Sequence, residues 1–290
     1  MCSIAGEVAA GRFIVAEDKI AKEGELIMIR IDKNLCTGCG TCVSDCISRV
    51  LSIREGKAYV LGECLKCGHC VAICPHAAPS IPNYSEVPVE YDSATFDIPT
   101  ENMLNTIKFR RSIRKFKDEH LSYDDLHILV DAAAHTPTAK NTQACRFVFI
   151  QDSLDDFKQA VWGTLRSAFE NYQELPIPRE SVGSFLALLD GENPQDYLFR
   201  NAPAVLCIQA PDPVDAGLAA SAIELVGATL GIGVLYNGYL RRVIASMSNI
   251  QSYLDMDLEE KPLVVCMLIG YSEREYKRSA PRRNPSVVLR

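Results

Sequence analysis

Two cysteine-rich blocks constrain this chain more than any other feature of its sequence. Eight of its twelve cysteines fall between Cys36 and Cys74, in two copies of the spacing CxxCxxCxxxC. A spacer from Ser48 to Glu63 separates the copies, so the segment is an internal repeat. The first twenty residues include three carboxylates and do not form a secretory signal. In a chain without such a signal, clustered cysteines indicate metal ligation rather than a disulfide framework.

Iron–sulfur clusters explain the cysteine spacing better than zinc does. Thiolates are the soft ligands that such clusters require, and the short intervals let one loop wrap a face of a cube with three sulfurs. A zinc site needs only two CxxC pairs, whereas each block here offers four cysteines. In two-block proteins the last cysteine of each block ligates the other cluster. The expected sets are Cys36, Cys39, Cys42 and Cys74 for one cluster and Cys64, Cys67, Cys70 and Cys46 for the other.

The repeat resembles the two-cluster ferredoxins of the bacterial type, which implies two 4Fe–4S clusters. Residues typical of strands lie on both sides of Glu55-Gly56, so the spacer is predicted to form a hairpin. The second block ends in Cys74-Pro75, as the ferredoxin motif does, whereas the first ends in Cys46-Ile47. We expect this difference to alter the turn at Cys46 and not the ligation.

The chain is long enough for about two domains. It has 290 residues, of which 48% are hydrophobic, and domains average roughly 150 residues. The sequence from Met28 reads like the start of a ferredoxin, so we hypothesise that Met28 is a genuine or alternative start. On this basis we expect an N-terminal extension over 1–27, a two-cluster ferredoxin domain over 28–80, a proline-rich linker over 81–101 and a second domain over 102–290.

The second domain alternates helical and strand patterns. The spacing of apolar residues predicts helices over Asp124–Ala134 and Phe157–Phe169. Short buried strands are expected over Phe147–Ile150, Ala204–Gln209 and Leu263–Ile269. This order predicts an α+β layered domain, with a doubly wound sheet as the alternative.

One long apolar window, Leu218–Tyr236, raises the question of a membrane span. It contains Ser221, Glu224, Thr229 and three glycines, and a charged residue is costly at the centre of a membrane helix. We interpret it as a buried or subunit-interface helix, followed by a further helical stretch over Arg241–Leu254. We expect the protein to be cytoplasmic and to have no membrane partner.

The net charge of −7 argues against nucleic acid as a partner, because nucleic-acid binders neutralise phosphates with an excess of Lys and Arg. Any site for an anion must therefore be local. The segment Lys108–Lys117 places six basic residues in ten positions around Ser112. Arginine forks match phosphate oxygens, so the segment is a candidate phosphate clamp, with a solvated charged helix face as the alternative.

The second domain also resembles the nitroreductase family of FMN proteins. Residues 110–116, RRSIRKF, are similar to the family's opening RRSxRxF signature, and residues 137–143, PTAKNTQ, are similar to its P-S/T-x-x-N-x-Q loop. Asn201-Ala202-Pro203 precedes a strand as in the family, and Leu230-Gly231-Ile232-Gly233 leads to Asn237-Gly238. The resemblance covers about residues 102–283 and implies a nitroreductase-like α+β sandwich domain.

This resemblance implies an FMN site shared between two subunits of a homodimer. The basic segment and the C-terminal tail would hold the phosphate and ribityl chain, the second motif would contact the flavin from the partner subunit, and the backbone after the last motif would face its reactive edge. In that order the implied residues are Arg110, Arg111, Ser112 and Arg114 with Arg278 and Arg282; Thr138, Ala139, Asn141 and Gln143; and Asn237 and Gly238.

Two further residues near the loop could carry chemistry, and we assign it to neither. Cys145 lies just before a strand and is interpreted as packing, although the family often has an aromatic there. His135 is expected to cap the end of its helix.

The predicted function is that of an iron–sulfur flavoprotein oxidoreductase. Clusters carry single electrons and a flavin exchanges one or two, so the fusion allows electrons to accumulate on FMN. The acceptor would be a nitroaromatic, a quinone or a conjugated alkene. The donor would be reduced ferredoxin, NAD(P)H or both. The alternative is an electron-transfer module that works between protein partners without a small-molecule substrate of its own.

Overall fold

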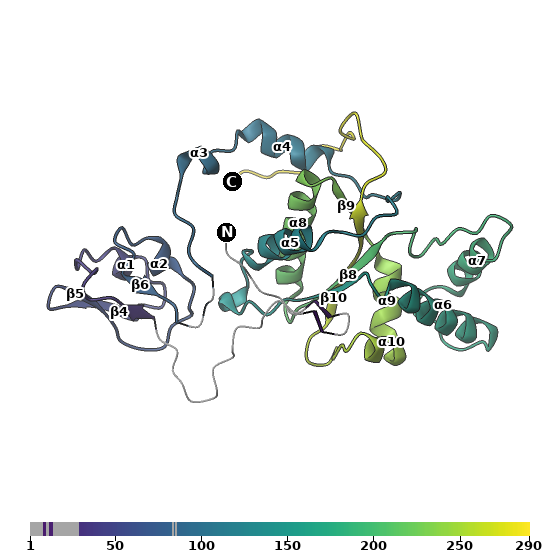
Figure 1. The fold of residues 1–290 in the computed structure, drawn as a ribbon, viewed down its shortest axis with the longest axis horizontal. Coiled ribbons are helices and arrows are strands. Elements are labelled where there is room, and N and C mark those ends of the chain that lie inside the picture. The colour runs from purple at the N-terminus through teal and green to yellow at the C-terminus, as the bar shows by residue number, and fades with distance from the viewer. Residues whose placement is uncertain (1–7, 10–11, 14–28, 83, 85) are drawn as a thin grey trace. The chain divides into compact units, whose positions relative to one another are not determined.

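The structure is a computed structural model that describes residues 8–9, 12–13, 29–82, 84 and 86–290. The chain divides into two compact units, Met1–Phe96 and Asp97–Arg290 (Figure 1). The start hypothesised at Met28 and most of the extension over 1–27 lie outside the described residues. Within the extension, strand β1 (Val8–Ala9) pairs antiparallel with β2 (Arg12–Phe13).

The first unit has two similar halves, one around each cysteine block. In each half a glycine with left-handed φ, 80° at Gly40 and 75° at Gly68, precedes a one-turn helix that carries a buried cysteine. Glycine suits these positions because other residues are strained there. The helices are α1 (Thr41–Ser44) and α2 (His69–Ala72), and the strands are β3 (Arg30–Ile31), β4 (Leu51–Arg54), β5 (Lys57–Val60) and β6 (Pro79–Ser80).

Strands β4 and β5 pair antiparallel, which confirms the hairpin predicted for the spacer. Both turn residues have left-handed φ, 49° at Glu55 and 72° at Gly56, as a type I′ turn requires. The turn approaches the first cysteine loop closely, since a Cβ added at Gly38 would lie 2.1 Å from the carbonyl oxygen of Gly56. A side chain at position 38 would therefore displace the hairpin.

A small core joins the two halves of the first unit. Strand β3, before the first block, pairs antiparallel with β6, after the second block. Buried apolar side chains pack against the cysteines beneath the strands; these residues are Ile29, Leu51, Ala58 and Ala78 with Cys36, Cys42 and Cys70.

Residues 86–105 are all exposed. The stretch expected as a linker, 81–101, contains helix α3 (Ser93–Phe96), and α4 (Thr100–Phe109) begins before its end. No residue of α4 is buried. Its apolar side chains are 42–45% exposed, and they are Met103, Leu104, Ile107 and Phe109.

The second unit is built on a four-stranded sheet in the order β7-β8-β10-β9. All three pairings are antiparallel, so the doubly wound alternative is wrong. The strands confirm the three that the sequence predicts and add β9; they are β7 (Arg146–Ile150), β8 (Ala204–Gln209), β9 (Ile232–Tyr236) and β10 (Leu263–Tyr271).

Helices cover both faces of the sheet, which gives an α+β sandwich (Figure 1). Side chains of β8 alternate between two cores: Ala204, Leu206 and Ile208 face one, while Val205 and Cys207 face the other. The first core includes α5 (Tyr123–Ala134) and α8 (Pro213–Thr229). The second includes α6 (Leu154–Glu170), α7 (Arg179–Leu189), α9 (Gly238–Ser246) and α10 (Ser248–Tyr253). Helices α5 and α6 confirm the two predicted helices.

The sequence suggested that the apolar window Leu218–Tyr236 is one helix, but the structure divides it between a helix and a strand. Helix α8 ends at Thr229, and Gly231, with φ 74°, turns the chain into strand β9. A Cβ added at Gly233 would lie 2.0 Å from Ile113, so the second glycine lets β9 approach the basic segment. Both glycines were visible in the sequence, but the turn and the close approach depend on tertiary packing. Among the described residues no helix is both long and apolar enough to cross a membrane.

Candidate functional site

The eight cysteines of the two blocks gather in two groups of four around two cavities in the first unit. None of these eight forms a disulfide. Each group combines three sulfurs of one block with the last sulfur of the other. The first sulfur set is Cys36, Cys39, Cys42 and Cys74, and the second sulfur set is Cys46, Cys64, Cys67 and Cys70.

Burial and neighbouring cysteines raise the pKa values of Cys42 and Cys70. Burial is the main cause that raises the pKa of Cys70 to about 12, and three neighbouring cysteines add to it. Burial and then the other three members of the first sulfur set raise the pKa of Cys42. Thiols in such groups become thiolates when a positive charge lies among them, so each set has the chemistry of a metal-cluster site.

Hydrogen-bond donors lie beside the sulfurs. The hydroxyl Oγ1 of Thr41 is 3.3 Å from Cys39 Sγ, and this contact lowers the pKa of Cys39. The N–H of Lys66 donates to Cys64 Sγ at 3.2 Å. Such donors stabilise negative charge on sulfur, whether a thiolate or a cluster carries it.

The second unit contains a pocket of about 320 Å³ in which Arg110 and Arg111 of the basic segment meet Arg274 of the tail. Ser112 and Arg114 are exposed and do not line this pocket; the Arg114 Nη1 donates to the Ser112 carbonyl at 3.4 Å. The pocket is lined by Thr106, Phe109, Arg110, Arg111, Ile113, Glu224, Ala228, Thr229, Gly231, Ile232, Gly233, Ser272, Arg274, Glu275 and Tyr276.

Glu224 of α8 brings a carboxylate to the wall of this pocket. The residue is 8% exposed, and its Oε1 accepts a hydrogen bond from Arg110 Nη1 at 3.2 Å. Burial raises the pKa of Tyr236 to about 12, and the charge of Glu224 adds to this effect. Glu224 was not among the residues expected at the site. Its signal was an acidic residue in an apolar helix, but its partner became visible only in the fold.

The loop of the second motif is held by α8 and does not line the pocket. The carboxylate of Asp215 accepts from Ala139 N–H at 3.1 and 3.3 Å, and the Thr138 hydroxyl accepts from Gln143 N–H at 2.9 Å. Asn141 and Gln143 have left-handed φ values of 55° and 50°. Non-glycine residues in this region are uncommon, and they often mark functional loops.

Asn237 and Gly238 form the start of helix α9. The Asn237 Oδ1 accepts from Leu240 N–H at 3.0 Å, and its Nδ2 donates to the Leu198 carbonyl at 2.7 Å, so this buried side chain is fixed from two sides. Gly238 is exposed, and its carbonyl accepts from Arg242 Nε at 3.1 Å.

Three aromatic rings form a row next to Gly238. Phe185 packs on Tyr239 and on Tyr197, with ring centroids 5.3 and 4.7 Å apart. The guanidinium of Arg242 lies 5.4 Å from the Tyr239 centroid, and that of Arg200 lies 4.0 Å from the Tyr197 centroid. The start of α9 therefore carries a surface of aromatic rings and positive charge.

The tail after β10 is exposed over residues 273–290. Arg278 and Arg282 lie in it and do not line the pocket, to which the tail instead contributes Ser272, Arg274, Glu275 and Tyr276. The tail therefore reaches the pocket, as expected, but the tail residues that line it are not the two that were expected to contact the phosphate.

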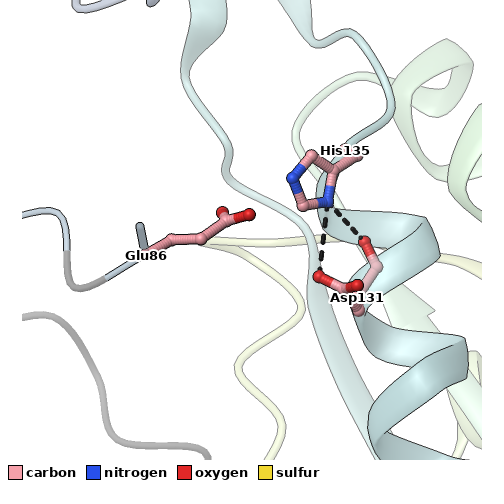
Figure 2. Close-up of side chains that lie close together, drawn as sticks. All are labelled: Glu86, Asp131 and His135. Atoms are coloured by element: carbon pink, nitrogen blue, oxygen red, sulfur yellow. Dashed lines mark hydrogen bonds and ion pairs between the residues drawn. The ribbon is translucent and has the colours of Figure 1, made fainter. Parts of the chain in front are cut away.

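His135 and Cys145 have the structural roles that the sequence indicated. His135 is the residue at which α5 ends, and its Nδ1 lies 2.9 Å from the Asp131 carbonyl oxygen and 3.4 Å from Asp131 Oδ1 (Figure 2). Cys145 is half-buried against the core of α5 and α8, and burial, followed by the charge of Asp215, raises its pKa. A thiol with a raised pKa is a weak nucleophile at neutral pH.

Comparison with protein families gives two matches on this chain. The model of the nitroreductase family matches residues 107–271, and that of the 4Fe-4S dicluster domain matches residues 28–75. No curated protein sequence matches the chain.

Solved structures match the second unit. A nitroreductase with bound FMN from Bacteroides fragilis NCTC 9343 is 18% identical, with a TM-score of 0.53, and covers 66% of this chain and 100% of its own. A nitroreductase with bound FMN from Desulfitobacterium hafniense DCB-2 is 23% identical, with a TM-score of 0.51, and covers 65% and 98%. An FMN-dependent nitroreductase from Clostridium difficile R20291 is 19% identical, with a TM-score of 0.50, and covers 66% and 100%. These similarities establish the fold of the second unit.

Proposed function

The chain belongs to the nitroreductase family, and on that premise we propose that it is an iron–sulfur flavoprotein oxidoreductase. Two 4Fe–4S clusters and an FMN would pass electrons to a small acceptor. The observation that carries this proposal is the presence, on one chain, of two crossed four-sulfur sets and a separate arginine-rich pocket in a nitroreductase fold.

The two sulfur sets fit the ligand sets of two clusters. Each offers four thiols around one cavity, and each takes its fourth sulfur from the other block, as two-cluster ferredoxins do. The match of residues 28–75 to a dicluster domain supports the same assignment. The ferredoxin domain is proposed to span 28–80, with the linker over 81–101 and the flavin domain over 102–290.

The arginine-rich pocket fits the phosphate of FMN. Arg111 and Arg274 bring positive charge to it, and Arg110 has forked donors beyond the nitrogen that binds Glu224. Glu224 would repel a phosphate, so Arg110 must stand between the two anions. Ser112, Arg114, Arg278 and Arg282 stay proposed contacts with the phosphate or the ribityl chain, which the basic segment and the exposed tail would supply.

A homodimer would complete the flavin site. The loop residues Thr138, Ala139, Asn141 and Gln143 lie outside the lining of the arginine-rich pocket, and they would contact the flavin of the partner subunit. Helix α4 has an apolar face with no buried residue, which a second copy of the chain would cover. Light scattering of the purified protein tests this part, and a monomer would contradict it.

The acceptor would bind beside Asn237-Gly238. When bound, FMN supplies hydride transfer from its N5 to an acceptor and takes up electrons singly or in pairs. The exposed rings of Tyr197 and Tyr239, which both pack on the buried Phe185, offer surfaces on which a planar nitroaromatic, quinone or conjugated alkene could stack. The fixed side chain of Asn237 holds the start of α9 in one conformation beside that position.

The decisive experiment is anaerobic turnover of the purified protein with reduced ferredoxin and with NADPH, supplied separately, against nitro, quinone and enone acceptors. We expect a brown protein with about eight irons and one FMN per chain that reduces at least one acceptor class. A loaded protein that exchanges electrons only with other proteins would instead be an electron carrier, and the acceptor part of the proposal would be withdrawn.

A further inference from the structure

The two sulfur sets differ in how many hydrogen bonds reach their sulfurs. In the first sulfur set, Ala58 N–H donates to Cys36 Sγ at 3.3 Å and Ala78 N–H donates to Cys74 Sγ at 3.4 Å. The Thr41 contact with Cys39 adds a third. The second sulfur set receives one such bond from the described residues, from the N–H of Lys66.

Two lysine ammonium groups also bind the backbone next to the first sulfur set. The ammonium of Lys57 donates to the carbonyl of Cys36 at 2.6 Å, and that of Lys33 donates to the carbonyl of Ala58 and lies 3.3 Å from the centroid of Tyr59. Both cations are thus anchored on the backbone that surrounds Cys36.

The second sulfur set lies in more apolar surroundings. Besides the four cysteines, its cavity is lined by five aliphatic side chains and by Ser48 and His69; the aliphatic residues are Ile29, Ile47, Val50, Leu51 and Val60. It has a cation of its own in Lys66, which stands between two of its ligands in the sequence. Charge alone therefore does not separate the two sets as clearly as the hydrogen bonds do.

We infer, on the basis of the proposed clusters, that the cluster of the first sulfur set has the higher reduction potential and that Thr41 and Lys57 help to set this order. Reduction adds one electron to a cluster, and sulfur-directed hydrogen bonds and nearby cations stabilise that added negative charge. The first electron from an external reductant therefore resides on the first set, and the second electron goes to the second set. Thr41 and Lys57 are positioning residues that tune the potential and do not ligate iron.

An anaerobic dithionite titration of the full chain, followed by electron paramagnetic resonance, tests this order. We expect two separate one-electron steps. Thr41→Val keeps nearly the same shape but removes the hydroxyl. At a fixed potential, the ratio of reduced to oxidised cluster in the more positive step should fall about fivefold in this variant. A fivefold change equals about 40 mV for a one-electron couple. The control Ser44→Ala removes a hydroxyl that binds the Thr41 carbonyl instead of a sulfur, and leaves both steps unchanged.

Lys57→Gln provides a second test that does not change helix α1. It should move the same, more positive step in the same direction. Arg54→Gln removes an equal charge from the residue paired with Lys57 in the hairpin and should leave that step in place. Movement of the more negative step, two coincident steps, or equal effects of a variant and its control would each overturn the inference while the proposed function stands. About four irons per chain in place of eight would overturn both.

Discussion

Arg110 lies where two anions would compete for one guanidinium. Its Nη1 is 3.2 Å from the buried carboxylate of Glu224, and the same side chain lines the proposed phosphate pocket. Arg110 and Arg111 belong to the basic segment that the sequence predicts to be a phosphate clamp, and both line this pocket. The sequence could not identify Glu224 as the partner of Arg110, because the two residues are 114 positions apart and meet only when α8 packs in the fold.

Arg110→Ala should weaken the binding of FMN more than that of riboflavin. Riboflavin lacks the phosphate, so it loses less when the guanidinium is removed. A charge-assisted hydrogen bond contributes about 1.5–3 kcal/mol, and we expect the difference between the two flavins to approach this range. Fluorescence titration of the apoprotein measures both affinities, with Arg166→Ala as the control, because Arg166 lies in α6, pairs with Asp190 and is not a proposed flavin contact. Equal losses for the two flavins would move Arg110 away from the phosphate.

A substitution of Cys46 tests whether the last cysteine of the first block ligates the other cluster. Cys46→Ser should damage the cluster of the second sulfur set, although Cys46 belongs to the first block. We expect a loss of up to about four irons per chain, with the signal of the other cluster retained. Cys145→Ser serves as the control, because Cys145 lies in the second unit and should leave the iron content unchanged. Loss confined to the first set would contradict the crossing.

Among the elements, the region from α8 to β9 separates what the sequence could predict from what it could not. Strands β7, β8 and β10 and helices α5 and α6 follow from their apolar periodicity and have the expected positions. Strand β9 was missed because its apolar residues continue directly from the apolar helix α8. The helix ends at Thr229, and the left-handed turn at Gly231 leads into β9, which pairs antiparallel with β10. Helix α7 was not predicted either.

Gly233→Ala tests the close approach of β9 to the basic segment. The added Cβ would lie 2.0 Å from Ile113 Cγ1 and 2.8 Å from its Cβ, so the strand or the segment must move. Overpacking of this kind costs about 1–3 kcal/mol. Thermal unfolding can be followed by the fluorescence of Trp162, the single tryptophan, which lies in α6. The control Gly163→Ala meets no atom within 4 Å in the middle of α6 and should stabilise by about 0.5–1 kcal/mol.

At the scale of the whole molecule, the fusion has a purpose only if the clusters exchange electrons with the flavin. The clamp, the loop and the tail all lie after Asp97, where the second unit begins. A chain shortened to residues 97–290, which keeps α4 whole, should therefore still dimerise and bind FMN. It should lose turnover driven by reduced ferredoxin and keep any turnover driven by NAD(P)H. Unchanged ferredoxin-driven turnover would show that the clusters take no part in the reaction.

The exposed stretch of residues 86–105 determines which proteases can separate the two units. It contains Glu86, Glu90 and Glu101 but no lysine or arginine, and none occurs anywhere between Lys66 and Lys108. Brief digestion with a glutamate-specific protease should therefore yield an iron-containing fragment and a flavin-containing fragment that separate on a sizing column. Trypsin, at equal activity, has no site in that stretch, and should leave the chain uncut between Lys66 and Lys108.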